Sequence, residues 1–197
     1  MANVEKHTEF ETKYRVDASV MMRFKRIMAQ YQAEFRYVEG PDDYFVKPDT
    51  NSFKRYRHAT YPKDAKKEIT TKIKPEGAKH NIQRRELNLD VTFADPEVVK
   101  ATIEDDGFAY NFTVFKSCHI FDTEDASVTF YSVVDITPGE KHDEEHLIEI
   151  EVAEDLVSQI TESQAWDIIN KYEKALAAIG VNPQKRLKLS IFESYRR

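Results

Sequence analysis

Charged residues of the same sign recur two positions apart in several short segments of this chain. Acidic pairs lie near both ends, as Glu9 with Glu11 and as Glu149 with Glu151. Two basic pairs lie between them, and these are Arg55 with Arg57 and Lys72 with Lys74. Residues two apart point to the same face of a strand, so each pair would present both charges on one side.

Paired charges of this kind suggest a ligand. Two exposed like charges at this spacing repel by a few tenths of a kcal/mol, and folding alone does not require them. Converging Arg and Lys side chains match phosphate oxygens, and converging carboxylates match hard cations such as Mg²⁺ and Mn²⁺. The pattern therefore predicts a site for a phosphate chain with a divalent cation. For any one strand, the plain alternative is the solvated face of an antiparallel sheet, with surface ion pairs.

Eight segments have the alternation or the flanking turn residues of strands. They are Thr8–Val16, Arg36–Pro48, Ser52–Thr60, Lys67–Pro75, Asn81–Val91, Phe108–Asp122, Ser127–Ile136 and Glu144–Val152. Helices are predicted over residues 18–36, between the cap Asp95 and the stop Gly107, and from the capping residue Thr161 to Gly180. The basic tail Asn182–Arg197 fits neither pattern.

This order of elements predicts an α+β fold with an antiparallel sheet, in one domain over residues 1–197. About eight strands are enough to close into a barrel. We expect the charged parity of the strands to line a water-filled lumen. The apolar stripes of residues 20–31 and 165–179 would then cover the opposite face.

Composition narrows the class of protein. The chain has 197 residues, a net charge of −6 and a single cysteine, Cys118, which excludes an internal disulfide framework. Mean hydropathy is −0.64, and no apolar run is long enough to cross a bilayer. We therefore expect a soluble cytoplasmic protein, with no membrane partner and no DNA-coating role.

The ordered motifs resemble those of the triphosphate tunnel metalloenzymes, the CYTH superfamily, over roughly residues 5 to 195. The hallmark Glu-x-Glu-x-Lys is similar to Glu9-Phe10-Glu11-Thr12-Lys13, and the closing Glu-x-Glu to Glu149-Ile150-Glu151. The intervening motifs are similar to Tyr44-Phe45 with Pro48-Asp49, Arg55-Tyr56-Arg57, Lys72-Ile73-Lys74, Arg84-Arg85-Glu86, Lys116, and Asp135 before Gly139. The chain departs from the family pattern at Asn88 and Cys118.

The resemblance implies an antiparallel eight-stranded closed tunnel that accepts a triphosphate with Mg²⁺ or Mn²⁺. The implied phosphate-binding residues are Lys13, Arg55, Arg57, Lys72, Lys74, Arg84, Lys116 and Lys185, with Arg186 or Lys188 as alternatives for the last of them. The implied metal ligands are Glu9, Glu11, Glu149 and Glu151, with Glu86 and Asp135 in support. The implied nucleophile is a metal-activated water, for which Glu9 and Glu11 are the candidate catalytic residues. The alternative is that these carboxylates pair with the cations and hold no metal.

The first functional hypothesis is a metal-dependent hydrolase that attacks the terminal phosphorus of tripolyphosphate or of a nucleoside or organic triphosphate. The alternative is a class IV-like adenylyl cyclase that makes cyclic AMP and pyrophosphate. An RNA 5′-triphosphatase would need a basic mouth, for which the candidates are Lys63, Lys66, Lys67 and Lys79. A polyphosphate-binding module without turnover is the fourth reading. The substrate's organic group would have Tyr14, Phe45 and Tyr56 as candidate contacts, and the protein would be a monomer or homodimer.

Overall fold

The computed structural model describes residues 4–48, 50, 52–62, 64–73, 83–139, 144–188 and 190–196, and within these ranges it does not place the side chains of residues 4–7, 73 and 83–85. Eight strands form one antiparallel sheet. They are β1 (Val4–Val16), β2 (Glu34–Val46), β3 (Phe53–Tyr61), β4 (Asp64–Ile73), β5 (Gln83–Asp90), β6 (Ala109–Asp122), β7 (Ala126–Asp135) and β8 (Glu145–Val152). The predicted α+β class with eight antiparallel strands is confirmed.

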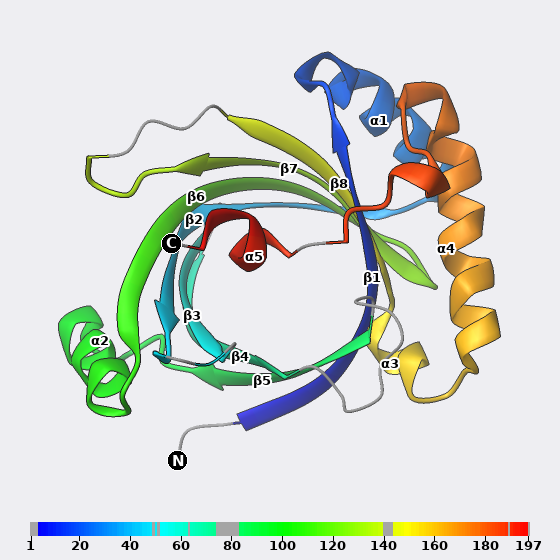
Figure 1. Ribbon diagram of the computed structural model, residues 1–197. Helices are drawn as coiled ribbons and strands as arrows, with labels where there is room; N and C mark the ends of the chain where they lie inside the picture. Colours follow the sequence, from blue (N-terminus) through cyan, green and yellow to red (C-terminus); the bar gives the residue numbers. More distant parts are fainter. Residues whose placement is uncertain are drawn as a thin grey trace.

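The sheet curls strongly, in the order β1-β5-β4-β3-β2-β6-β7-β8, and Figure 1 shows it bending around a central space. The pairings return to their start through β1, at a staggered seam. The first half of β1 pairs with β5, from Val4 to Phe10, whereas the second half pairs with β8, from Glu11 to Val16. Each level of β1 is therefore hydrogen-bonded to one neighbouring strand only.

Three of the helices lie on the outer side of this sheet (Figure 1). They are α1 (Met21–Met28), α2 (Pro96–Asp105) and α4 (Glu162–Leu176). As predicted, Asp95 caps α2, and Thr161 forms a capping box with Gln164 at the start of α4. Within the described residues, no helix is long and apolar enough to cross a membrane.

The predicted helix over residues 18–36 is too long. Short 3₁₀ turns, η1 (Ala18–Val20) and η2 (Ala29–Tyr31), flank α1. Gln32 then adopts a left-handed conformation with φ of 53°, which ends the helical path, and β2 begins at Glu34. The apolar spacing that signals the helix also stops at Tyr31.

The predicted cover of the outer face is confirmed. Phe24 and Met28 of α1 and Ile169 and Tyr172 of α4 are buried against outward-facing residues of β1, β7 and β8, such as Ile150. Because this parity of the strands is buried beneath helices, the opposite, charged parity is left to face the interior.

The interior is charged over part of its length only, which corrects the expectation of a water-filled lumen throughout. The C-terminal helix α5 (Ile191–Tyr195) lies inside the curve of the sheet (Figure 1). Its Ile191, Phe192 and Tyr195 pack with inward-facing apolar residues, among them Phe53, and the Phe53 and Phe192 rings stack with centroids 4.1 Å apart. A five-residue helix is unstable alone, so these contacts are what hold α5 in place.

Candidate functional site

A cavity of about 410 Å³ occupies the rest of the interior, a volume typical of small-molecule sites. Ten of the residues predicted from sequence line it. They are Glu9, Glu11, Lys13, Arg55, Arg57, Lys72, Glu86, Lys116, Glu149 and Glu151. They come from β1, β3, β4, β5, β6 and β8, so strands far apart in the sequence contribute to one charged space.

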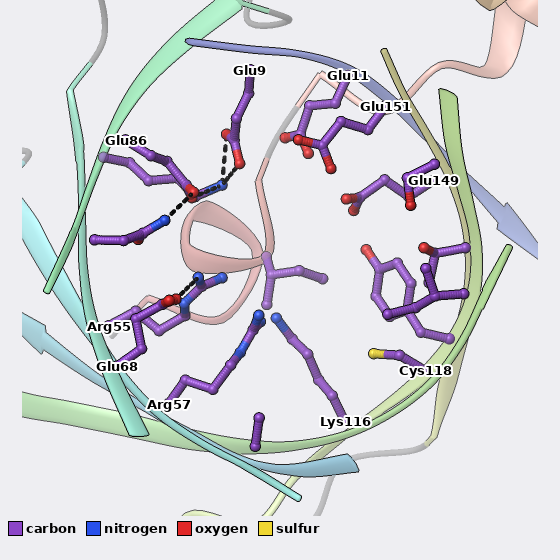
Figure 2. Close-up of a pocket in the computed structure, with 18 of the residues that line it drawn as sticks. Glu9, Glu11, Arg55, Arg57, Glu68, Glu86, Lys116, Cys118, Glu149 and Glu151 are labelled. Carbon is purple, nitrogen blue, oxygen red and sulfur yellow. Dashed lines mark hydrogen bonds and ion pairs between the residues drawn. The ribbon is translucent and has the colours of Figure 1, made fainter. Parts of the chain in front are cut away.

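The acidic side of the cavity is built by β1 and β8. Glu11 lies opposite Glu151, and Lys13 opposite Glu149, in the antiparallel register of these strands. Figure 2 shows the carboxylates of Glu11, Glu149 and Glu151 pointing into the cavity from the same side. Lys13 lies among them, forming ion pairs with Glu11 and, at 3.0 Å, with Glu149.

Crowding of these carboxylates changes their protonation. Burial, together with the nearby Glu11 carboxylate, raises the pKa of Glu9 to about 8. Burial and the carboxylates of Glu9, Glu149 and Glu11 raise the pKa of Glu151 well above its ordinary value. The acidic side therefore holds more carboxylates than the neighbouring lysines neutralise.

Lys72 divides its charge between two acids. Its Nζ lies 2.8 Å from a carboxylate oxygen of Glu9 and 2.6 Å from one of Glu86. Burial alone would raise the pKa of Glu86, but Lys72 and Arg55 outweigh it and hold that pKa well below its usual range. Glu86 is thus a partner of the cations, and it matches the supporting role better than a metal-ligand role.

The basic side is built by β3 and β6, and Figure 2 shows Arg57 and Lys116 converging from it toward the centre of the cavity. Asp42, which the sequence analysis missed, lies behind both. The Arg57 guanidinium donates hydrogen bonds to the two carboxylate oxygens of Asp42 at 2.8 and 3.0 Å. The Lys116 Nζ lies 2.7 Å from one of these oxygens. Burial opposes ionisation, but these cations keep the pKa of Asp42 far below its usual value.

Two residues of β4 also line the cavity: Lys66, which the sequence offered only as a candidate for a basic mouth, and Glu68, which was missed. Glu68 lies 2.9 Å from Lys66 and 3.8 Å from Arg55, and it accepts a hydrogen bond from Thr70. It shares its strand face with Lys72, and that parity was the available signal.

Four predicted residues are not shown to reach the cavity. Lys185 is exposed on the outer 3₁₀ turn η4 (Pro183–Lys185), because the chain returns to the interior only afterwards. Asp135 is buried at the end filled by α5, paired in register with Val114 of the apolar cluster. Arg84 lies opposite Glu9 in register, but its side chain is not placed, and Lys74 lies outside the described residues.

The three predicted aromatic contacts face away from the cavity. Tyr14 is buried under α4, and Phe45 and Tyr56 are buried with residues of α2, because all three have the outward parity. The aromatic residues that line the cavity are Tyr44, Phe53, Tyr61, Tyr131 and Phe192. Cys118 lines it too, and burial raises the pKa of its thiol to about 11, so it remains a small neutral side chain.

The donor chemistry of the acidic side fits a hard cation. Glu9, Glu11, Glu149 and Glu151 offer the oxygen ligands that Mg²⁺ and Mn²⁺ prefer. In the described part of the chain, no three acidic, thiol or imidazole groups already stand at metal-ligand spacing. The carboxylates Glu9, Glu11 and Glu149 are instead held in ion pairs with Lys72 or Lys13. A metal ion would therefore have to draw them out of these pairs.

No protein-family model and no curated protein matches this chain. Several solved structures do. The PH1819 protein of Pyrococcus horikoshii OT3 is 19% identical with a TM-score of 0.69, and covers 94% of this chain and 97% of its own. The PH1012 protein of the same organism is 23% identical with a TM-score of 0.68, and the match covers 96% of this chain and 99% of that protein. A proposed adenylate cyclase of Vibrio parahaemolyticus is 18% identical with a TM-score of 0.62, and the match covers 96% of this chain and 98% of that protein.

At these identities the likeness concerns the fold. It extends over nearly the full length of both chains. The comparisons therefore show a fold shared with these solved structures.

Proposed function

We propose that the chain is a metal-dependent hydrolase of triphosphate-containing substrates, acting on the terminal phosphorus. The observation that supports this most is the arrangement of charge in the cavity. Carboxylates of β1 and β8 face Arg and Lys residues of β3 and β6 across one space of about 410 Å³. A substrate that carries both a polyphosphate chain and a divalent cation is complementary to both sides.

In this proposal Arg55, Arg57 and Lys116 bind the phosphate oxygens and neutralise the charge that develops on the leaving group. Phosphoryl transfer depends mainly on such positioning and electrostatic stabilisation. Asp42 holds Arg57 and Lys116, and Glu86 holds Lys72, so the cations are oriented before substrate arrives. We assign Lys13 and Lys72 to the phosphates as well.

We assign Glu9, Glu11, Glu149 and Glu151 to one or two Mg²⁺ or Mn²⁺ ions. Such an ion, when bound, supplies charge neutralisation on the phosphates and makes water a better nucleophile. When Lys13 and Lys72 turn to the phosphates, the carboxylates that they now contact become available as ligands.

Product analysis tests the proposal. The protein is incubated with ATP and Mn²⁺, or with tripolyphosphate and Mn²⁺, and the products are separated. We expect ADP and phosphate from ATP, and pyrophosphate and phosphate from tripolyphosphate. Binding without turnover of either compound would refute the hydrolase and leave a polyphosphate-binding module.

A class IV-like adenylyl cyclase is the second candidate, and the fold shared with a proposed adenylate cyclase of Vibrio parahaemolyticus favours it. The same cavity would serve, with the ribose 3′-hydroxyl attacking the α-phosphorus. Cyclic AMP and pyrophosphate in the same assay would identify it.

An RNA 5′-triphosphatase has less support. Four lysines were candidates for a basic mouth, and the structure describes two of them, Lys66 and Lys67, whose side chains point to different places. Lys66 lines the cavity, whereas Lys67 donates to the Ala94 carbonyl at 3.2 Å. Lys63 and Lys79 lie outside the described residues.

A further inference from the structure

The cavity has a floor. Ser190, Ile191 and Phe192, at the start of α5, line it at one end. The same residues of α5 pack with inward-facing side chains of the surrounding strands, including Tyr44, Phe112 and Val133. The end of the interior that lies beneath them is filled with apolar side chains, so a ligand chain cannot pass through it.

Cations gather directly above this floor. On β3, Phe53 packs with α5, and Arg55 is the next residue on the same strand face. On β6, Val114 packs with α5, and Lys116 is the next residue on the same face. Lys13 joins them, since its carbonyl accepts a hydrogen bond from the amide of Leu187, in the segment that leads to α5. The deepest part of the cavity therefore holds Arg55 and Lys116 from two different strands, together with the buried Asp42 that pairs with Lys116.

Tyr131 of β7 belongs to the same level. It packs with the α5 cluster, lines the cavity and is only 3% exposed. Its hydroxyl has no hydrogen-bond partner among the described residues, although buried hydroxyls normally have one. A phenol keeps its proton at neutral pH, so this hydroxyl is available as a hydrogen-bond donor.

We propose that Tyr131 and the cations above α5 form a receptor for the terminal phosphate of the substrate, so that the cavity admits only phosphate chains with a free end. This inference rests on the proposed function. The terminal phosphate of a triphosphate carries more negative charge than an internal one, because its second ionisation occurs near neutral pH. It is therefore the group that the cations above the floor prefer, and the organic group remains toward the opposite end of the cavity.

Blocked substrates test the free end. Diadenosine tetraphosphate has a total charge similar to that of ATP, but both of its ends are esterified. Binding of each to the wild-type protein is measured by titration calorimetry without added metal, so that turnover does not interfere. We expect ATP to bind at least roughly tenfold more tightly. Equal affinities would overturn this inference and leave the proposed hydrolase standing. Failure to bind ATP and tripolyphosphate would overturn both.

Tyr131→Phe tests the donor, with Tyr56→Phe as the matched control. Tyr56 also has a buried, unpartnered hydroxyl, but it lies on the outer face with residues of α2. We expect Tyr131→Phe to weaken tripolyphosphate binding roughly tenfold or more, and Tyr56→Phe to bind as the wild type does. Unfolding curves of both variants verify that they are folded. Wild-type affinity in Tyr131→Phe would overturn the assignment.

Discussion

Asp42 and Glu151 are both carboxylates on the inward face of the same sheet, yet their surroundings shift their pKa values in opposite directions. Asp42 contacts two cations, which keep its pKa far below the usual value. Glu151 is surrounded by other carboxylates, which add to the effect of burial and raise its pKa. The direction of the pKa shift therefore distinguishes a carboxylate that is paired with cations in the ligand-free protein from one that is surrounded by other carboxylates.

Replacement of Glu151 by Gln removes one member of the crowded acidic side. A carboxyl whose folded-state pKa is raised costs stability as the pH rises above its unfolded pKa, about 4.3. Without metal, we therefore expect Glu151→Gln to have a higher Tm than the wild type at pH 8, and a smaller difference at pH 5. Affinity for Mn²⁺ should fall roughly tenfold or more.

The control for this prediction is Glu124→Gln, an exposed residue in the turn between β6 and β7. It should change neither Tm nor Mn²⁺ affinity. A loss of Tm in Glu151→Gln at pH 8 would show that Glu151 is a structural ion-pair partner and would contradict the metal assignment.

Asp42→Asn should destabilise the protein by about 3–5 kcal/mol, because it leaves Arg57 and Lys116 without their buried partner. The pKa of Asp42 is depressed in the folded state, so its contribution is complete above its unfolded pKa of about 3.9 and declines as the pH falls below that value. Urea unfolding at pH 7 and pH 3.5 should show the difference between variant and wild type narrowing at the lower pH.

Asp122→Asn is the comparison for Asp42, since Asp122 forms a solvent-exposed pair with Arg36 at 2.5 Å. Its loss should cost at most about 1 kcal/mol. Equal losses in the two variants would mean that Asp42 is not the anchor of the basic side.

Residues that repeat at spacing two could be placed from their spacing, and Lys116 from its likeness to a family motif, whereas Asp42 and Glu68 had neither signal. Like charges at spacing two indicate one face of a strand, as in the pairs Glu9 with Glu11 and Arg55 with Arg57. All four of these residues line the cavity. Asp42 is followed two positions later by Tyr44, and Glu68 by Thr70, so neither has a like-charged companion. Their role depends on partners on neighbouring strands, and sequence spacing does not reveal those.

At the scale of elements, the same distinction separates α4 from α5. The long apolar stripe and the capping box of α4 predict it without tertiary information. The helix α5 has five residues, too few for a periodic pattern, and it exists because Phe53, Tyr44 and Phe112 surround its aromatic side chains. The floor of the cavity was therefore not predictable, and neither was the exposed position of Lys185, which precedes it.

Phe192→Ala tests whether α5 is part of the stable fold. Phe192 is 4% exposed and stacks on Phe53, so its truncation should cost about 3–5 kcal/mol in free energy of unfolding. Phe192→Leu keeps most of the volume and should cost less than about 1.5 kcal/mol. Denaturant unfolding measures both. A loss below about 1 kcal/mol in the alanine variant would show that α5 is only loosely associated.

At the scale of the whole molecule, the fold gathers charges of both signs in one cavity and places them on opposite sides of it. The chain has a net charge of −6, yet the cavity brings Lys13, Arg55, Arg57, Lys72 and Lys116 together. The basic side of the cavity, with Arg55, Arg57 and Lys116, is where we expect a small anion to be attracted. We expect tripolyphosphate to raise Tm by linkage, equivalent to about 2.7 kcal/mol at a hundredfold excess over Kd. The shift should shrink with added NaCl, and orthophosphate at the same concentration should give a smaller one.

The most direct test of the account is the location of both ligands in one crystal. The protein is crystallised with Mn²⁺ and a tripolyphosphate whose bridging oxygens are replaced by NH groups, so that it is not hydrolysed, and the anomalous signal of manganese locates the metal. The account predicts manganese among Glu9, Glu11, Glu149 and Glu151, and a phosphate chain that contacts Arg55, Arg57 and Lys116. Manganese or tripolyphosphate bound only on the outer surface, with the cavity carboxylates still paired to Lys13 and Lys72, would contradict it.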